Sequence, residues 1–189
     1  MGYSSVAITD HVDSSNLDFV VSSLVKGARD LNQRQSVRVI PGAEITHVPP
    51  GLIETLVKQA RDLGAEIVLV HGETIVEPVA PGTNRAAILS GVDILAHPGL
   101  ITAEDIELAT ERGVYLEISA RHGHSFTNGH VAIMAKEYGA KLVLNSDAHS
   151  PRDLMTRQFA RMVAHGTGLG KDAFDEMLGN SQELIKKIP

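Results

Sequence analysis

The chain has 189 residues, 43% of them hydrophobic and 21% charged, which suits one well-buried domain over residues 1–189 and is too short to predict two. Its formal net charge of −6, with no run of Lys or Arg, disfavours nucleic acid as the main partner, because phosphate binding needs a basic patch. With no cysteine, any metal would be held by nitrogen and oxygen. No signal peptide and no apolar run of roughly eighteen residues occurs, so we expect a cytoplasmic protein with no membrane partner.

Six short runs rich in Val, Ile and Leu, each ending in polar residues, predict buried strands. They start 22 to 33 residues apart, a spacing typical of repeated strand–helix units in a parallel sheet. The predicted strands are Ser4–Asp10, Val37–Glu44, Glu66–His71, Val92–His97, Val114–Ser119 and Lys141–Asp147.

Amphipathic segments with helix-ending residues lie between the strands. Leu17–Leu31 and Leu52–Leu63 carry apolar residues at helical spacing, and Thr102 with Asp105 resembles a capping box before a helix that ends at Gly113. Further predicted helices are Gly129–Tyr138, Pro151–Ala164, Lys171–Leu178 and a short last helix, Ser181–Ile188, packed on the outside. The alternation predicts an α/β fold of the TIM-like barrel class.

Histidine, glutamate and aspartate fall at the carboxyl ends of the strands. In a parallel sheet or barrel these ends meet at one rim, where ligands usually bind. A single histidine there is often a structural hydrogen-bonding residue, but acidic and histidine residues from five of six strands are hard to obtain by accident. They predict a multinuclear metal site formed by His11, Glu44, His71, His97, Asp147 and His149.

Two arginines and two histidines are candidates for contacts with a phosphorylated substrate. Arg121 follows the fifth strand and Arg85 lies at a predicted helix start, so both are candidate phosphate ligands. The alternative interpretation of each is a solvated arginine on the surface. His122 and His124 share the loop of Arg121 and, together with it, are the candidate catalytic residues, with one histidine donating a proton to a leaving group.

Other polar residues near the strand ends have supporting or structural interpretations. Glu73 and Glu117 are candidates to orient a ligand imidazole. Three more histidines belong to predicted loops or helix faces, and we expect them to be bystanders: His47, His130 and His165.

Five segments resemble signature regions of the PHP (polymerase and histidinol phosphatase) family, in order and over almost the whole chain. They are Ile8-Thr9-Asp10-His11, Pro41-Gly42-Ala43-Glu44, Val70-His71-Gly72, Ala96-His97-Pro98-Gly99 and Ser146-Asp147-Ala148-His149. The resemblance implies a distorted seven-stranded (βα)7 barrel with two or three zinc, manganese or iron ions. It also implies a metal-dependent phosphatase that hydrolyses phosphate monoesters of a small metabolite with metal-activated water.

The same resemblance implies a role for each ligand. Glu44 would bridge two ions, His71 and His97 would complete one site, Asp147 would serve the second, and His11 with His149 would hold the third. Arg121, His122 and His124 would then face the substrate phosphate.

The chain departs from the PHP pattern at its start. The family begins with a strand carrying His-x-His, whereas this chain opens at Met1 in what should be the second strand. We therefore expect six of seven βα units, with the first strand and helix missing through an internal start or a fragment, and an incomplete metal site. The two strands beside the gap, Ser4–Asp10 and Lys141–Asp147, would have unpaired edges.

Two alternatives to a phosphatase stay open. An amidohydrolase-like enzyme that cleaves C–N bonds also uses histidines on barrel strands, but it usually bridges its metals with a lysine, and the strand ending Val70-His71 supplies none. A catalytically impaired scaffold that binds metal is the other alternative. The sequence leaves open the substrate, the metal and whether the chain forms a homo-oligomer.

Overall fold

One parallel sheet organises the protein, whose computed structural model describes residues 2–188. The strand order is β1-β3-β4-β5-β6-β7, and β2 also pairs with β3. The strands are β1 Ser5–Ile8, β2 His11–Val12, β3 Arg38–Ile45, β4 Ile67–His71, β5 Ile94–Ala96, β6 Tyr115–Ser119 and β7 Leu142–Asn145. All six predicted strands are present. The extra strand, β2, continues β1 after a break, since Ile8 lies opposite Pro41 and His11 opposite Glu44 on the same neighbour.

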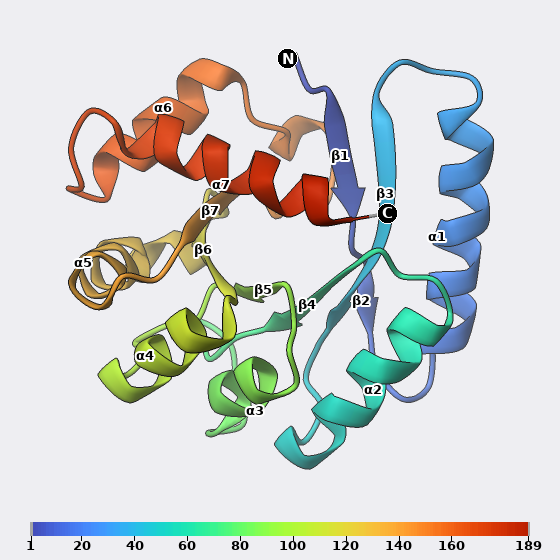
Figure 1. Ribbon diagram of the computed structural model, residues 1–189, viewed down its shortest axis with the longest axis horizontal. Helices are drawn as coiled ribbons and strands as arrows, with labels where there is room; N and C mark the ends of the chain where they lie inside the picture. Colours follow the sequence, from blue (N-terminus) through green and yellow to red (C-terminus); the bar gives the residue numbers. More distant parts are fainter. Residues whose placement is uncertain (1, 189) are drawn as a thin grey trace.

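Seven helices and two short 3-10 turns connect and cover these strands within residues 2–188 (Figure 1). The helices are α1 Leu17–Asn32, α2 Pro50–Asp62, α3 Thr83–Leu89, α4 Ala103–Arg112, α5 Asn128–Tyr138, α6 Arg157–Gly166 and α7 Ala173–Lys187. The predicted cap of α4 is confirmed, because the Thr102 side chain accepts a hydrogen bond from the Asp105 amide and Gly113 ends the helix at φ 69°.

The predicted helix Pro151–Ala164 is wrong as a single element. The segment forms a 3-10 turn, Pro151–Asp153, and then α6, with an extended Leu154 between them. Thr156 starts α6 anew, because its hydroxyl accepts a hydrogen bond from the Phe159 amide.

Alternate residues of each strand face two different cores, as the two-residue period of a strand requires. Val68, Val70 and Leu116 pack in the core that contains the surrounding helices. The other face of the sheet carries a second core that includes Ile67, Leu69 and Tyr115. On this second face of the sheet, the next residue after Leu69 in β4 is His71, and the next residue after Tyr115 in β6 is Glu117. Both lie nearer to the carboxyl ends of their strands. The candidate site is therefore built on the inner face of the sheet, directly beyond its apolar core.

Helix α7 covers this inner face, which corrects the predicted tail. Residues 171–188 contain one long helix, Ala173–Lys187, rather than two short ones, and Leu184 and Ile188 belong to the inner core beside Ile40 and Tyr115. Figure 1 shows α7 lying across the sheet rather than outside it. The reason is that β1 and β7 do not pair with each other within residues 2–188, so the sheet forms a half-barrel whose inner apolar surface needs a cover.

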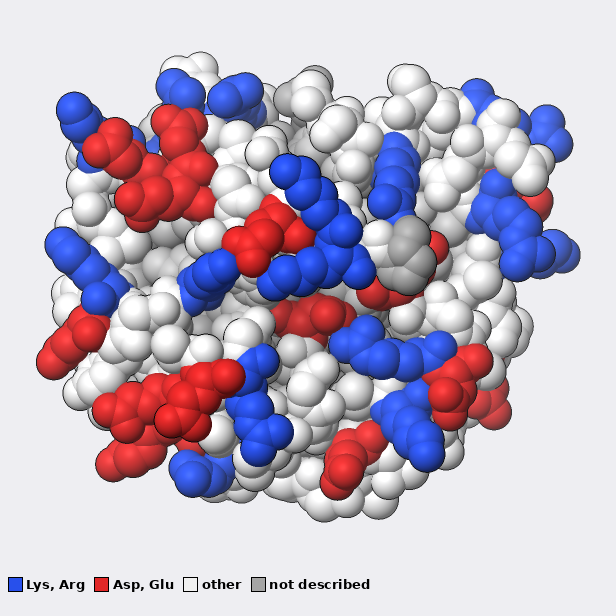
Figure 2. Space-filling model, viewed as in Figure 1, with Lys and Arg blue, Asp and Glu red and all other residues white. Residues whose placement is uncertain are grey.

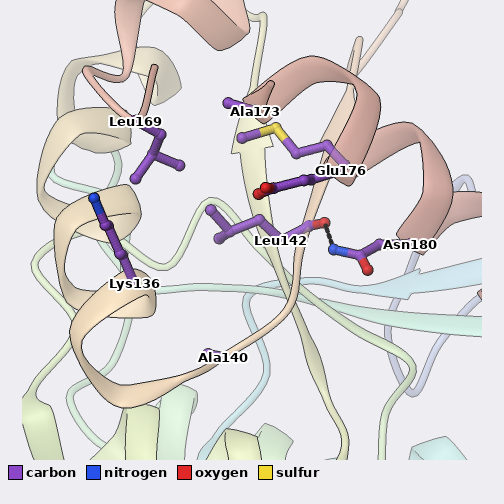
Figure 3. A pocket seen from close by; sticks show the side chains of 8 residues that line it. Lys136, Ala140, Leu142, Leu169, Ala173, Glu176 and Asn180 are labelled. Carbon is purple, nitrogen blue, oxygen red and sulfur yellow. Dashed lines mark hydrogen bonds between the residues drawn. The ribbon is translucent and has the colours of Figure 1, made fainter. Parts of the chain in front are cut away.

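Helix α7 also donates a hydrogen bond to a backbone carbonyl on the open edge of β7. Asn180 donates a hydrogen bond from Nδ2 to the Leu142 carbonyl at 2.8 Å, on the wall of a hollow of about 360 Å³ between α5 and α7 (Figure 3). At the other edge, the Tyr3 hydroxyl donates to the Met155 carbonyl at 2.9 Å and links the start of the chain to the segment after β7. β1 and β7 are thus the two edge strands of the sheet, and Asn180 satisfies one carbonyl of the β7 edge.

The architecture confirms an α/β half-barrel of parallel strands with surrounding helices, of the TIM-like class. The count of seven βα units stays a prediction. Within residues 2–188, no helix combines the length and apolar character that crossing a membrane would take.

Candidate metal centre at the strand ends

The structure brings all six predicted metal ligands to one rim. At its centre, Nε2 of His97 lies 2.8 Å from Nδ1 of His71, and Oε1 of Glu44 lies 3.3 Å from that same Nδ1. His97 directly follows β5, His71 ends β4, and Glu44 lies within β3. Each of the three is less than a tenth exposed. Three buried polar side chains in mutual contact are an arrangement that costs desolvation energy, which a bound cation would offset.

The outer part of the rim is formed by His11, Asp147 and His149. Nε2 of His11 lies 3.4 Å from Nε2 of His149, while Nδ1 of His11 contacts the Thr46 hydroxyl at 2.7 Å. Nδ1 of His149 lies 3.4 Å from a carboxylate oxygen of Asp147. This part is more open to solvent than the centre, since the His149 side chain is 46% exposed.

Glu117 orients His97, as predicted. Its Oε2 accepts from both the His97 backbone amide and Nδ1 at 2.9 Å, and its Oε1 accepts from Asn145 Nδ2 at 2.8 Å. Burial alone would lower the pKa of His97, but the hydrogen bond and charge of Glu117 outweigh it and raise that pKa. Burial would likewise raise the pKa of Glu117, but the contact with His97 lowers it. The pair fixes His97 with Nε2 directed at the centre of the rim.

His124 lies at the rim, stacked on His97. The two ring centroids are 4.0 Å apart, and Nδ1 of His124 contacts the Thr74 hydroxyl at 2.9 Å. Burial, and next the neighbouring His97, lower the pKa of His124 to about 4. His124 is therefore a neutral imidazole at pH 7, which is the form that binds metals.

Asp147 completes this side of the rim. Its pKa is raised by burial and by the charges of Glu117 and Glu44, although Arg121 lies 3.7 Å from one carboxylate oxygen. His124 Nε2 is 3.9 Å from the same oxygen. Repulsion among these carboxylates is the kind of instability that a bound divalent cation relieves.

Three groups of side chains have the spacing of metal sites, and two of them consist of rim residues alone. The ligand atoms within each group lie within 4.8 Å of one another. One group is His11, Glu44 and His71, and the other is His97, His124 and Asp147. The first lies wholly within the predicted ligand set, and the second joins two predicted ligands to His124, which was predicted as a catalytic residue.

The backbone is strained at the same place. Among residues 2–188, the non-glycine residues with positive φ are His47 at 52°, His97 at 27° and Asp147 at 48°. Each costs of order 1–3 kcal/mol unless the surrounding structure holds it, and such strain is concentrated at functional sites. All three follow the carboxyl end of a strand.

Three residues predicted to act at the site either lie away from the rim or make structural contacts instead. Arg85 is paired with Asp105 at 2.9 Å on the outer helices, so its guanidinium is neutralised away from the rim. His122 is exposed and packs edge-on against Phe126, outside the cluster. Glu73 does not orient an imidazole, because its Oε1 accepts the backbone amides of Gly82 and Asn84 at the start of α3.

Sequence reasoning also missed two residues that lie beside His71 at the candidate site. His47, expected to be a bystander, lies with its ring centroid 5.0 Å from that of His71, and Glu77 has a carboxylate oxygen 3.2 Å from His71 Nε2. Neither ends a predicted strand, so strand-end position could not select them. His130 is a structural residue, as expected, because its Nε2 contacts the Ile101 carbonyl.

Together, the fold and the rim define an α/β half-barrel protein with a buried histidine–carboxylate cluster at the carboxyl ends of its strands. No protein-family model matches the chain. The uncharacterized protein MJ1295 of Methanocaldococcus jannaschii is 45% identical over 187 residues, covering 97% of this chain and 86% of the relative. The chain belongs to the family of that archaeal protein.

More distant relatives carry a functional name. Ribonuclease P protein component 3 of Methanosarcina mazei is 28% identical over 204 residues, covering 99% of this chain and 79% of the relative. The protein of the same name from Methanosarcina acetivorans is 26% identical, with 97% and 77% covered.

Solved structures share the fold. A chain in the cryo-EM structure of archaeal ribonuclease P with mature tRNA has a TM-score of 0.77 at 17% identity, covering 98% of this chain and 82% of that one. The Arabidopsis N6-mAMP deaminase has a TM-score of 0.57 at 13% identity, covering 95% and 52%. A Xaa-Pro dipeptidase has a TM-score of 0.58 at 15% identity, covering 98% and 64%.

These comparisons overturn the expected function. The named sequence relatives are ribonuclease P components, so the assignment to the PHP family, and with it the phosphatase acting on a small phosphorylated metabolite, is wrong. The expectation that nucleic acid is not a main partner is corrected by the same finding. The resemblance arose because His, Asp and Glu at strand ends are a feature that the TIM-like architecture permits in many functions.

Proposed function

We propose that this chain is a non-catalytic protein component of an RNA-processing ribonucleoprotein of the ribonuclease P type. The observation that carries the proposal is the 28% identity with ribonuclease P protein component 3 over 99% of the chain. The fold supports it, because the TM-score with the ribonuclease P chain is 0.77 against 0.57 and 0.58 for the deaminase and the dipeptidase.

The charge of the protein decides how it would join such a particle. Its formal net charge is −6, and Figure 2 shows acidic and basic side chains interleaved over the face that carries α7. Affinity for RNA phosphates grows with the number of Lys and Arg contacts, and the acidic side chains interspersed among the basic ones weaken the attraction of this face for phosphates. We therefore propose that contacts with partner proteins supply most of the binding, with a small number of direct RNA contacts.

Reconstitution tests the proposal. Ribonuclease P RNA and the other protein subunits of the organism that encodes this chain would be mixed with and without it, then separated by size-exclusion chromatography. We expect the chain to co-elute with the particle and to raise the rate of precursor-tRNA cleavage. An unrelated acidic protein of similar size serves as the control. Elution of the chain alone, with an unchanged cleavage rate, would overturn the proposal.

We also propose that the rim formed by His11, Glu44, His71, His97, Asp147 and His149 binds divalent metal. The contact of 2.8 Å between two buried imidazoles and the crowding of carboxylates around them support it. Nitrogen and oxygen ligands suit zinc, manganese or iron. In a non-catalytic component, the ion would stabilise the rim by binding the folded state only.

A further inference from the structure

His71 presents its two ring nitrogens to two different environments. Nδ1 faces the rim, with Glu44 Oε1 at 3.3 Å and His97 Nε2 at 2.8 Å. Nε2 points the other way and is the only buried side-chain nitrogen or oxygen within residues 2–188 without a hydrogen-bond partner. The His71 side chain is 3% exposed, so water does not replace the missing partner.

Side chains of types that bind metals lie close to this nitrogen. Oε2 of Glu77 lies 3.2 Å from His71 Nε2 and 3.5 Å from Nε2 of His47. The contact between Glu77 and His71 lacks the direction of a hydrogen bond, since Nε2 counts as unpartnered. Two ligand atoms of a tetrahedral zinc ion, each about 2.0–2.1 Å from the metal, lie roughly 3.3 Å apart and off one another's hydrogen-bond axis. The observed geometry fits that pattern.

The protonation pattern points in the same direction. Nδ1 of His97 donates to Glu117, so Nε2 of His97 accepts and Nδ1 of His71, 2.8 Å away, carries the proton between them. Nε2 of His71 then keeps only a lone pair. That lone pair faces the Glu77 carboxylate, which is also an acceptor, and a cation between them removes the repulsion. In this tautomer His71 takes part in the rim as a hydrogen-bond donor and binds metal through Nε2.

We propose that His47, His71 and Glu77 form a second divalent-metal site, of the zinc class, at Nε2 of His71, next to the rim, where the other Glu77 oxygen lies 3.6 Å from His124 Nε2. The three ligand atoms lie within 4.8 Å of one another. The side chains of His47 and Glu77 are 47% and 39% exposed, so the remaining coordination position faces solvent and holds water. The left-handed backbone of His47 places its imidazole there at a cost in strain that the bound ion offsets.

The site is independent of any association with RNA and is tested on the isolated full-length chain. Protein stripped with a chelator would be titrated with Co²⁺, a substitute for Zn²⁺ with visible absorption, and the Zn²⁺ bound after dialysis would be counted by mass spectrometry. We expect His47→Ala and Glu77→Gln each to remove one equivalent of tightly bound metal, or to weaken its binding by more than about 100-fold, the upper range for loss of a supporting partner. Both residues are half-exposed, so the variants should fold, which circular dichroism would verify.

Two comparisons make the outcome decisive. His165→Asn and Glu176→Gln, at exposed positions of α6 and α7, should leave metal binding unchanged. Asp147→Asn reports on the rim. Stoichiometry and affinity in His47→Ala and Glu77→Gln equal to those of the original chain would overturn the second site, whether or not Asp147→Asn loses metal. Neither result bears on co-elution with a ribonucleoprotein.

Discussion

Nε2 of His97 lies 2.8 Å from Nδ1 of His71, and both imidazoles are buried. At that distance the two nitrogens share a proton or face a common cation, because two lone pairs cannot approach so closely without one. Glu117 holds the far nitrogen of His97, so a chain of contacts runs from β6 through two histidines to Glu77. The predictions about the rim follow from this chain.

Replacing Glu117 with Gln should lower the pKa of His97. The carboxylate raises that pKa in spite of burial, and an amide supplies no compensating charge. Because the folded pKa lies above the unfolded value, protonated His97 stabilises the fold at acid pH, and this contribution is lost as pH rises through the folded pKa. NMR titration of the histidine ring protons would measure the change. An unaltered pKa in Glu117→Gln would show that another group holds the proton on His97.

Glu44→Gln should lower the metal content of the rim. The amide keeps the shape of the side chain but removes the charge that lies 3.3 Å and 3.7 Å from His71 and His97. We expect a decrease of at least about tenfold in affinity for Zn²⁺ or Mn²⁺, by analogy with the loss of supporting ligands. Calorimetric titration of chelator-treated protein would measure it, with Glu54→Gln on the exposed face of α2 as the control. Equal affinities would place the metal elsewhere.

His124 should make the protein less stable as pH falls from about 6.5 to about 4. Its folded pKa of about 4 lies below the unfolded value, so the unfolded chain takes up a proton that the folded chain does not. The loss reaches up to about 3 kcal/mol near pH 4, at 1.36 kcal/mol for each unit of pKa difference. Urea denaturation of the original chain and of His124→Gln, from pH 7 to pH 4, would reveal a shallower pH dependence in the variant. Parallel curves would contradict the assignment.

Leu184→Ala should destabilise the protein by about 2–5 kcal/mol, the usual cost of truncating a buried leucine. Leu184 is 6% exposed in the inner core, where α7 covers the half-barrel. Leu100→Ala, at a leucine that is 64% exposed, is the matched control and should change the free energy of unfolding by less than about 0.5 kcal/mol. Similar losses in both variants would mean that α7 does not carry the inner core. Thermal and urea melts would measure the two changes.

Local sequence determined the elements and the rim of this protein. The six short runs rich in Val, Ile and Leu placed six strands correctly, and their spacing indicated a parallel α/β fold. The position of Glu44, His71 and His97 at strand ends placed them together, because parallel strands end at one rim. Glu117 was identifiable for the same reason, being on the inner face of β6.

Only the tertiary structure decided which distant segments meet. Periodicity shows that Leu184 is buried, but not that α7 turns into the half-barrel, since the same apolar face would also fit the outside. Arg85 reached Asp105 rather than the rim because α3 and α4 lie side by side, and His47 and Glu77 reached His71 through loops whose paths no repeating pattern encodes. The chemistry of the strand ends was readable from the residues, whereas their use was not, because proteins named as a deaminase, a dipeptidase and a part of ribonuclease P share this fold.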